Sequence, residues 1–101
     1  MKKYEIMYIV KPDLETEALK DKIEALSKTI TDFNSTIIEH KEMGLKDLAY
    51  EIDHYKKGYY VWQLVSANDE AINEFNRIVR ITEEVLRFIV VKAVEWGENY
   101  E

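Results

Sequence analysis

The sequence predicts an α+β fold, in which a four-stranded antiparallel sheet carries two helices on one face. Two observations indicate this fold. Four segments are rich in the β-branched, aromatic and other apolar residues typical of strands, and in two others apolar residues recur at steps of three and four residues. These segments follow one another in the order βαββαβ, and right-handed crossovers then place both helices on the same side of the sheet.

The first half of the chain is expected to form a strand, a helix and a second strand. Residues 3–10 alternate as a strand does, and the only proline, Pro12, closes this strand. Residues 14–33 carry an apolar stripe at helical spacing, with acidic residues in the first turns, where the helix dipole favours them. A β-branched run begins the second strand, which extends over residues 36–52 with a bend near Gly44.

The second half is expected to begin with a turn at residues 55–58, followed by a third strand over residues 59–67. Asn68 then supplies an N-cap for a shorter helix, which has Arg80 in its last turn. The last strand is expected over residues 86–94. With these elements in place, the predicted fold is the ferredoxin-like βαββαβ sandwich.

A single domain is expected to span residues 1–94, and residues 95–101 are expected to form a C-terminal tail. A chain of 101 residues can bury its own core, and the absence of cysteine excludes disulfides and thiolate metal sites. The N-terminus lacks the features of a signal peptide, and no apolar run approaches the roughly 20 residues of a membrane span. We therefore expect a cytoplasmic protein with no membrane partner.

Both faces of the predicted sheet are apolar, although the helices can cover only one of them. The residues expected on the uncovered face are Met7, Ile9, Tyr60, Trp62, Leu64, Ile89 and Val91. A large exposed apolar surface is typical of a contact surface for a partner. The alternative is that these bulky residues only satisfy β-propensity and lie under the stems of long charged side chains.

The sequence offers little chemistry for catalysis. It has no cysteine nucleophile, no Gly-x-Ser-x-Gly elbow, no metal-ligand spacing and no glycine-rich phosphate loop. The two histidines, His40 and His54, are expected to be ordinary surface residues. We therefore expect no enzyme, no cofactor, no metal site and no small-molecule substrate.

The RNA-recognition module shares this strand order and stacks bases on aromatic side chains of its sheet. Residues 57–59, Lys-Gly-Tyr, match the start of its signature, whereas Tyr60, Val61 and Leu64 do not fit the positions that follow. The net charge of −6 also disfavours nucleic-acid binding through bulk positive charge. An independent RNA-recognition-like module is one alternative interpretation.

Residues 44–52, Gly-Leu-Lys-Asp-Leu-Ala-Tyr-Glu-Ile, resemble the bacterial small-subunit (30S) ribosomal protein S6 family, which carries a Gly, a basic residue and Leu-Ala-Tyr-x-Ile at this point. Further shared features are Tyr4-Glu5 before an apolar strand, Pro12 after it, Gly58-Tyr59 opening a strand, and Arg87 before Val90-Val91-Lys92. The resemblance covers essentially the whole chain.

This resemblance implies a structural component of the small ribosomal subunit, located at the ribosome, that catalyses nothing. It implies binding to central-domain ribosomal RNA as a heterodimer with ribosomal protein eighteen. The expected RNA contacts are Lys2, Lys3, Lys46, Arg80, Arg87 and Lys92, and the expected protein-partner surface is Tyr60 and Trp62. The remaining alternative is a divergent or redesigned member that keeps the fold without RNA binding. Asp47, Thr82 and Leu86 motivate it, because they stand where relatives are often basic.

Overall fold

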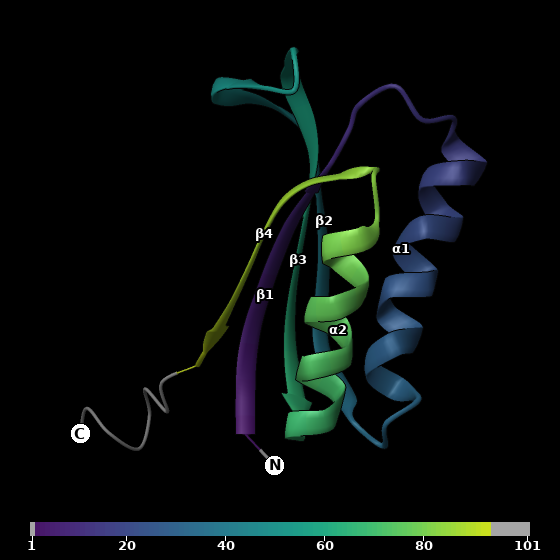
Figure 1. Cartoon of the computed structure of the whole chain (residues 1–101), viewed down its shortest axis with the longest axis vertical. Helices are drawn as coiled ribbons and strands as arrows, with labels where there is room; N and C mark the ends of the chain where they lie inside the picture. The colour runs from purple at the N-terminus through teal and green to yellow at the C-terminus, as the bar shows by residue number, and fades with distance from the viewer. Residues whose placement is uncertain (1, 94–101) are drawn as a thin grey trace.

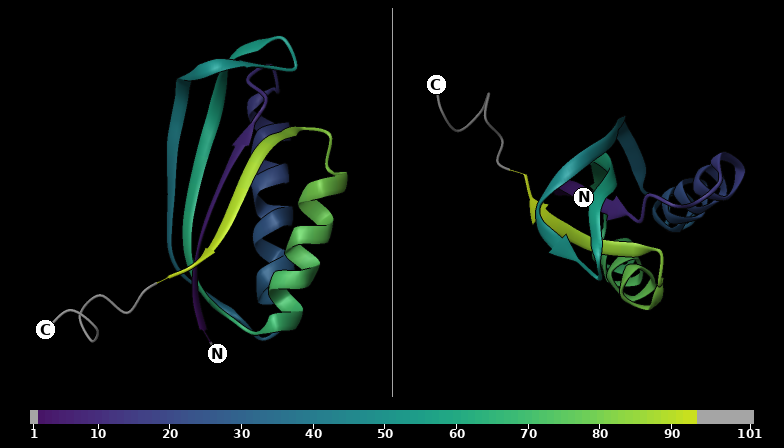
Figure 2. Two further views of the ribbon diagram at one scale, coloured as in Figure 1. Left: turned by 60° about the vertical axis from the view of Figure 1, so that its left-hand side comes forward. Right: turned by 90° about the horizontal axis from the view of Figure 1, so that it is seen from above.

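The computed structural model describes residues 2–93, which form one sheet and two helices (Figure 1). The strands are β1 (Lys2–Val10), β2 (Thr36–Ile52), β3 (Tyr55–Ala67) and β4 (Val85–Lys92), and the helices are α1 (Thr16–Thr31) and α2 (Asp69–Ile81). The sheet is antiparallel, in the order β2-β3-β1-β4. Both helices lie on the same side of it, and its other side is open (Figure 2). The fold class predicted from the sequence is therefore confirmed.

Alternate side chains of the two central strands form the core between the sheet and the helices. Fully buried apolar residues of β1 and β3 include Ile6, Tyr8, Val10, Val61 and Val65. The helices contribute Ile23, Leu26 and Ile30 from α1, and Ala71, Ile72, Phe75 and Val79 from α2. Burying each large aliphatic or aromatic side chain stabilises the fold by about 1.5–3 kcal/mol. The predicted apolar stripes of both helices are thus the surfaces that face the sheet.

The start of α2 is fixed by Asn68, as predicted. The Asn68 side-chain oxygen accepts a hydrogen bond from the backbone N–H of Ala71 at 2.8 Å, which satisfies a free donor of the first turn. Its amide nitrogen donates to the backbone carbonyl of Phe33 at 2.8 Å, and its backbone N–H donates to Ser35 Oγ at 3.2 Å. One residue therefore caps α2 and ties it to the segment that leaves α1.

The hairpin between β2 and β3 turns earlier in the chain than predicted, so the turn expected at residues 55–58 is wrong. Ile52 pairs with Tyr55, and only Asp53 and His54 lie between them. Both have positive φ, 48° and 71°, which is the backbone of a two-residue turn whose twist matches that of the strands. Strand β3 consequently begins four residues before the predicted start.

Gly58 lies inside the ladder and not in the turn. It pairs with Lys46 of β2, and a Cβ at this position would overlap Cγ2 of Ile9 on the neighbouring strand β1. The glycine is therefore required by a close approach between strands. The prediction of a turn here was wrong because glycine is typical both of turns and of close approaches between strands.

Strand β2 lies at one edge of the sheet and is irregular. Its pairing with β3 shifts register at three places, between Ile37 and Glu39, between Glu42 and Gly44, and between Asp47 and Ile52. At the first two shifts, Ile38 and Met43 fall outside the ladder. Gly44 has a φ of +84° at the second shift, where the sequence predicted a bend. Together with β3, the strand extends as a hairpin beyond the ends of both helices (Figures 1 and 2).

The last strand is shorter than predicted at its C-terminal end. Strand β4 ends at Lys92, and residues 94–101, which include the predicted tail, lie outside the described residues. Within residues 2–93, no helix is long and apolar enough to cross a membrane.

Candidate functional site

The uncovered side of the sheet, here called the open face, carries three rows of side chains that run across the strands. The central row is Lys41, Trp62, Met7 and Ile89, from β2 to β4. A second row is Glu39, Leu64, Glu5 and Val91, and a third is Gly44, Tyr60, Ile9 and Arg87. The apolar residues predicted for the uncovered face all lie in these rows, so that assignment is confirmed.

Among the apolar side chains of the open face, those on β4 are the most exposed to solvent. Ile89 and Val91 are 57% and 48% exposed, whereas Met7, Ile9 and Trp62 are half-buried by their neighbours. A hollow of about 170 Å³ lies on this side, lined by Glu5, Ile6, Met7, Trp62, Ile89 and Val91. An apolar face with a hollow suits the close packing of a partner's side chains.

Trp62 is held in place by two charged neighbours. Its indole N–H donates a hydrogen bond to Glu5 Oε1 at 3.3 Å, and the Lys41 ammonium lies 5.7 Å from the ring centroid. A cation at this distance is attracted to the face of the indole ring. The ring is therefore oriented before any partner binds, which lowers the entropy cost of association.

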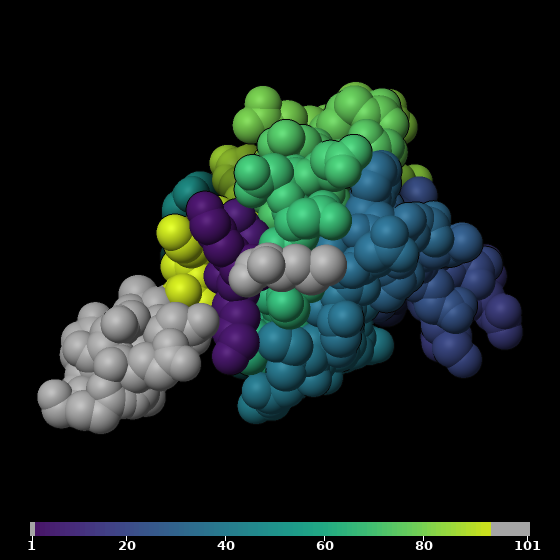
Figure 3. All heavy atoms as spheres, turned by 90° about the horizontal axis from the view of Figure 1, so that it is seen from below, coloured from purple at the N-terminus to yellow at the C-terminus, as the bar shows by residue number. Residues whose placement is uncertain are grey.

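Three of the six expected RNA contacts lie together at one end of the sheet. Lys2 and Lys3 begin β1, and Lys92 on β4 lies opposite Tyr4. The backbone N–H of Ala93 donates to the carbonyl of Lys3 at 2.8 Å, which holds these two chain segments together. Figure 3 shows this end of the molecule, with the start of β1 beside the end of β4.

The other three expected contacts are spread around the opposite end. Lys46 and Arg87 both lie on the open-face side, but on the two edge strands β2 and β4, with β3 and β1 between them. Arg80 lies in the last turn of α2, on the helix side. All six basic side chains are exposed; Lys2, Lys3 and Lys92 share one end of the sheet, where Lys3 projects from the open face and Lys2 and Lys92 project from the helix side.

Charge is distributed unevenly between the two sides of the molecule. On the open face the basic residues Lys3, Lys41, Lys46 and Arg87 outnumber the acidic residues Glu5 and Glu39. Over α1 and its ends the acidic residues Glu15, Glu17, Asp21, Glu24 and Asp32 outnumber the basic residues Lys20, Lys22 and Lys28. The net charge of −6 therefore does not describe the open face, and a polyanion would approach this side more favourably than the helices.

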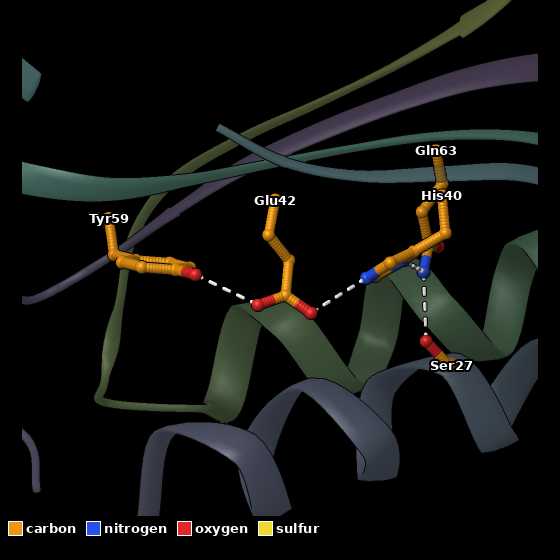
Figure 4. Close-up of polar contacts among 5 residues, drawn as sticks. All are labelled: Ser27, His40, Glu42, Tyr59 and Gln63. Atoms are coloured by element: carbon orange, nitrogen blue, oxygen red, sulfur yellow. Dashed lines mark hydrogen bonds and ion pairs between the residues drawn. The ribbon is translucent and has the colours of Figure 1, made fainter. Parts of the chain in front are cut away.

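A chain of polar contacts that the sequence did not predict lies on the helix side of β2 (Figure 4). The Gln63 amide donates to Ser27 Oγ and to His40 Nδ1, both at 2.8 Å. His40 Nε2 lies 3.1 Å from Glu42 Oε2, and the Tyr59 hydroxyl donates to Glu42 Oε1 at 2.8 Å. His40 is therefore part of a network between α1, β2 and β3, whereas it was expected to be an ordinary surface residue.

These contacts affect the acidity of Glu42. The hydrogen bond from His40, and then that from Tyr59, lowers the pKa of the Glu42 carboxyl below its usual range. The network borders a groove of about 680 Å³ between α1 and β2. Among the described residues, no group of acidic residues and histidines is arranged to hold a metal ion.

Comparison with known proteins identifies the family of this chain. A family model described as ribosomal protein S6 matches residues 3–92 of the chain. The chain belongs to the ribosomal protein S6 family. The matched segment contains every expected site residue except Lys2. The resemblance seen in the Leu-Ala-Tyr-x-Ile segment is thereby confirmed.

Several relatives in the ribosomal protein S6 family are similar over nearly their full length. The chain is 54% identical to small ribosomal subunit protein bS6 of Acholeplasma laidlawii over 95 residues, which are 94% of this chain and 100% of the relative. It is 54% identical over 92 residues to bS6 of Phytoplasma australiense, covering 91% and 99% of the two chains. The crystal structure of 30S ribosomal protein S6 from Thermotoga maritima superposes with a TM-score of 0.86, at 25% identity over 91% of this chain and 87% of that one.

Membership in the ribosomal protein S6 family assigns the chain a structural role in the small ribosomal subunit, and it confirms the expectation that the chain is not an enzyme. The open face, the exposed basic residues and the polar network are therefore features of a structural protein.

Proposed function

We propose that this chain binds ribosomal RNA of the central domain of the small subunit, as a heterodimer with ribosomal protein eighteen. The observation that carries the proposal is the open face, an uncovered apolar surface with basic residues at its rim in a chain of net charge −6. The apolar surface fits a protein partner, and a basic partner would supply the positive charge that RNA binding needs.

The basic residues of the chain add to that charge. Phosphate contacts position a protein on RNA, and exposed lysine and arginine side chains provide them. Lys2, Lys3 and Lys92 lie at one end of the sheet, Lys3 on the open face and Lys2 and Lys92 on the helix side, and Lys46 and Arg87 lie at the opposite end of the open face. The protein partner would then cover the centre of the open face while RNA contacts its ends.

The first experiment measures RNA binding by the chain alone and with ribosomal protein eighteen present. The chain alone is expected to bind a central-domain RNA fragment weakly, and the heterodimer is expected to bind it tightly. Absence of a heterodimer, together with absence of RNA binding when both proteins are present, would leave a family member that keeps the fold without the binding function. Co-sedimentation of the chain with small ribosomal subunits provides an independent measurement.

The chain offers a matched pair of variants for the protein interface. Ile89 on the open face and Ile81 at the end of α2 are both strongly exposed, at 57% and 65%. Ile89→Ser is expected to weaken the heterodimer about tenfold, because it removes apolar contact from the interface, whereas Ile81→Ser is expected to have no effect. Equal effects of the two substitutions would place the interface elsewhere.

Base stacking by the chain alone is the second candidate, because Tyr60 and Trp62 lie on the open face in neighbouring rows. Aromatic side chains on a sheet can stack successive bases of a single strand. Tight binding of a short single-stranded RNA by the chain alone, abolished in Tyr60→Ala or Trp62→Ala, would favour this function over the heterodimer.

A further inference from the structure

We infer that the hollow beside Glu5 on the open face receives one long basic side chain, arginine or lysine, from the protein partner. This inference rests on the proposed function, since it specifies the chemistry of one contact within the proposed heterodimer. The hollow has a volume of about 170 Å³ and is lined by Glu5, Ile6, Met7, Trp62, Ile89 and Val91.

The lining combines an aliphatic wall with a single carboxylate. Met7, Ile89 and Val91 provide the wall, and Val91 lies directly opposite Glu5 in the ladder between β1 and β4. Arginine and lysine have the matching shape, because their aliphatic stems cover apolar surface while the charged end reaches a polar group. A purely aliphatic side chain would instead remove the Glu5 carboxylate from water without compensation.

The carboxylate of Glu5 is positioned to accept a donor from outside. Oε1 accepts the hydrogen bond of the Trp62 indole at 3.3 Å, which fixes the carboxylate beside the hollow. Only Oε1 takes part in that bond, so the lone pairs of Oε2 are left for a further donor. A hydrogen bond to a charged donor is roughly twice as strong as a neutral one, and an arginine presents several such donors in a plane.

Trp62 forms one side of the hollow and is fixed in place. The Lys41 ammonium lies 5.7 Å from the centroid of the indole ring and is attracted to it. The same residue lines the hollow and donates to Glu5. A basic side chain in the hollow would therefore meet a carboxylate and an indole ring held in fixed relation to each other.

The position of the acidic residues favours a basic protein over RNA at this place. Glu39 and Glu5 lie on either side of Leu64 in one row of the open face. Two carboxylates in the row repel the phosphates of an approaching strand, whereas they attract lysine and arginine side chains. Of the basic residues that would contact phosphate, Lys46 and Arg87 lie toward the other end of the face, and Lys3 lies two residues from Glu5 on β1.

The experiment compares Glu5→Gln with Glu39→Gln in binding to ribosomal protein eighteen. Glutamine has nearly the shape of glutamate and keeps an oxygen that can accept from the Trp62 indole, so Glu5→Gln removes little besides the charge. We expect Glu5→Gln to weaken the heterodimer about tenfold and to reduce the dependence of its affinity on salt. Glu39→Gln, in the same row at the edge strand, is expected to change the affinity by less than about twofold. Circular dichroism and thermal unfolding confirm that both variants are folded.

A second measurement identifies the partner's side chain. Each exposed arginine and lysine of ribosomal protein eighteen is replaced by glutamine and tested against both the unchanged chain and Glu5→Gln. One such substitution is expected to weaken binding to the unchanged chain while leaving binding to Glu5→Gln almost unaltered, because the two groups form one contact.

The outcomes separate the inference from the proposed function. If the unchanged chain binds ribosomal protein eighteen and Glu5→Gln binds it equally well, or if no basic residue of the partner couples to Glu5, the inference is wrong and the heterodimer stands. If the unchanged chain does not bind this partner, both are wrong. Self-association of the chain that Glu5→Gln abolishes would assign the hollow to a second copy. Binding of single-stranded RNA that is unaffected by Glu5→Gln and abolished in Trp62→Ala would assign it to RNA.

Discussion

The side-chain amide of Gln63 donates a hydrogen bond of 2.8 Å to Nδ1 of His40, so the neutral His40 ring carries its proton on Nε2. That proton points toward Glu42 Oε2, 3.1 Å away. Because Gln63 is fully buried, an amide N–H deprived of its acceptor would remain without water as a substitute. The polar network is thus part of what holds β2 and α1 against β3.

Ser27→Ala is expected to lower the free energy of unfolding by about 1–2 kcal/mol, because the buried Gln63 amide loses the Ser27 acceptor. Thr29→Ala is the matched control on the same helix, since its hydroxyl donates only to the Ala25 carbonyl at an exposed position. Both substitutions place alanine, which has a higher helix propensity than serine or threonine, at a helical position. Urea unfolding of both variants measures the difference, and equal stabilities would show that the Ser27 hydrogen bond contributes nothing.

Glu42→Gln is expected to change how stability depends on acidity. The His40 and Tyr59 hydrogen bonds lower the pKa of Glu42 in the folded chain, so this carboxylate stabilises the fold above its unfolded pKa. That contribution disappears as the pH falls through the folded pKa. The advantage of the unchanged chain over Glu42→Gln in urea unfolding should therefore shrink as the pH falls below the unfolded pKa of glutamate, about 4.3. Glu39→Gln, exposed on the same strand, serves as the control, and parallel pH profiles for both variants would contradict the assignment.

Gly58→Ala is expected to destabilise the chain by about 1–3 kcal/mol, because the added methyl group would overlap Cγ2 of Ile9. Ile9→Ala alone also costs stability, since it removes apolar packing on the open face. In the double variant the new methyl group finds room, so the destabilisation should be smaller than the sum of the two single effects. Thermal and urea unfolding of all three variants measure this coupling, and strict additivity would mean that the two residues do not compete for space.

Replacing Lys2, Lys3 and Lys92 by glutamine is expected to weaken RNA binding by the heterodimer uniformly across sequences. It should also reduce the slope of log affinity against log salt concentration by about 0.7–0.9 for each phosphate that the variant no longer neutralises. The control replaces Lys20, Lys22 and Lys28 on α1, which changes the net charge equally on the helix side. If both triple variants bind RNA with the same reduced affinity, the net charge of the chain determines the affinity and the location of Lys2, Lys3 and Lys92 does not.

The sequence was sufficient for the fold because each element had a periodic pattern and a clear boundary signal. The stripes of α1 and α2 and the Asn68 cap were all predicted and lie where expected. The predicted turn at residues 55–58 is wrong because Gly58, a residue typical of turns, lies inside the ladder. The actual turn uses Asp53 and His54 in a backbone conformation that glycine usually adopts, so sequence composition alone favoured the wrong residue.

The open face could be predicted in part, and the polar network could not. Alternation along β1, β3 and β4 assigned the apolar residues to the correct side, but the grouping of Lys2, Lys3 and Lys92 depends on strand register. The network joins Gln63 to residues 36 and 23 positions away in the sequence, and no local pattern indicates such contacts. Gln63 itself was the available signal, because a polar residue between Val61 and Val65 in a core-facing register requires hydrogen-bond partners.

The irregular pairing of β2 limits how far a further strand could extend the sheet at this edge. An edge strand presents a row of unpaired backbone groups, and beside an apolar face it would recruit further copies into a growing sheet. Ile38 and Met43 lie outside the regular ladder, near the two ends of the first half of β2. An incoming strand could therefore form only a few consecutive hydrogen bonds. Irregularity at the edge thus opposes the addition of further strands beside an uncovered apolar face.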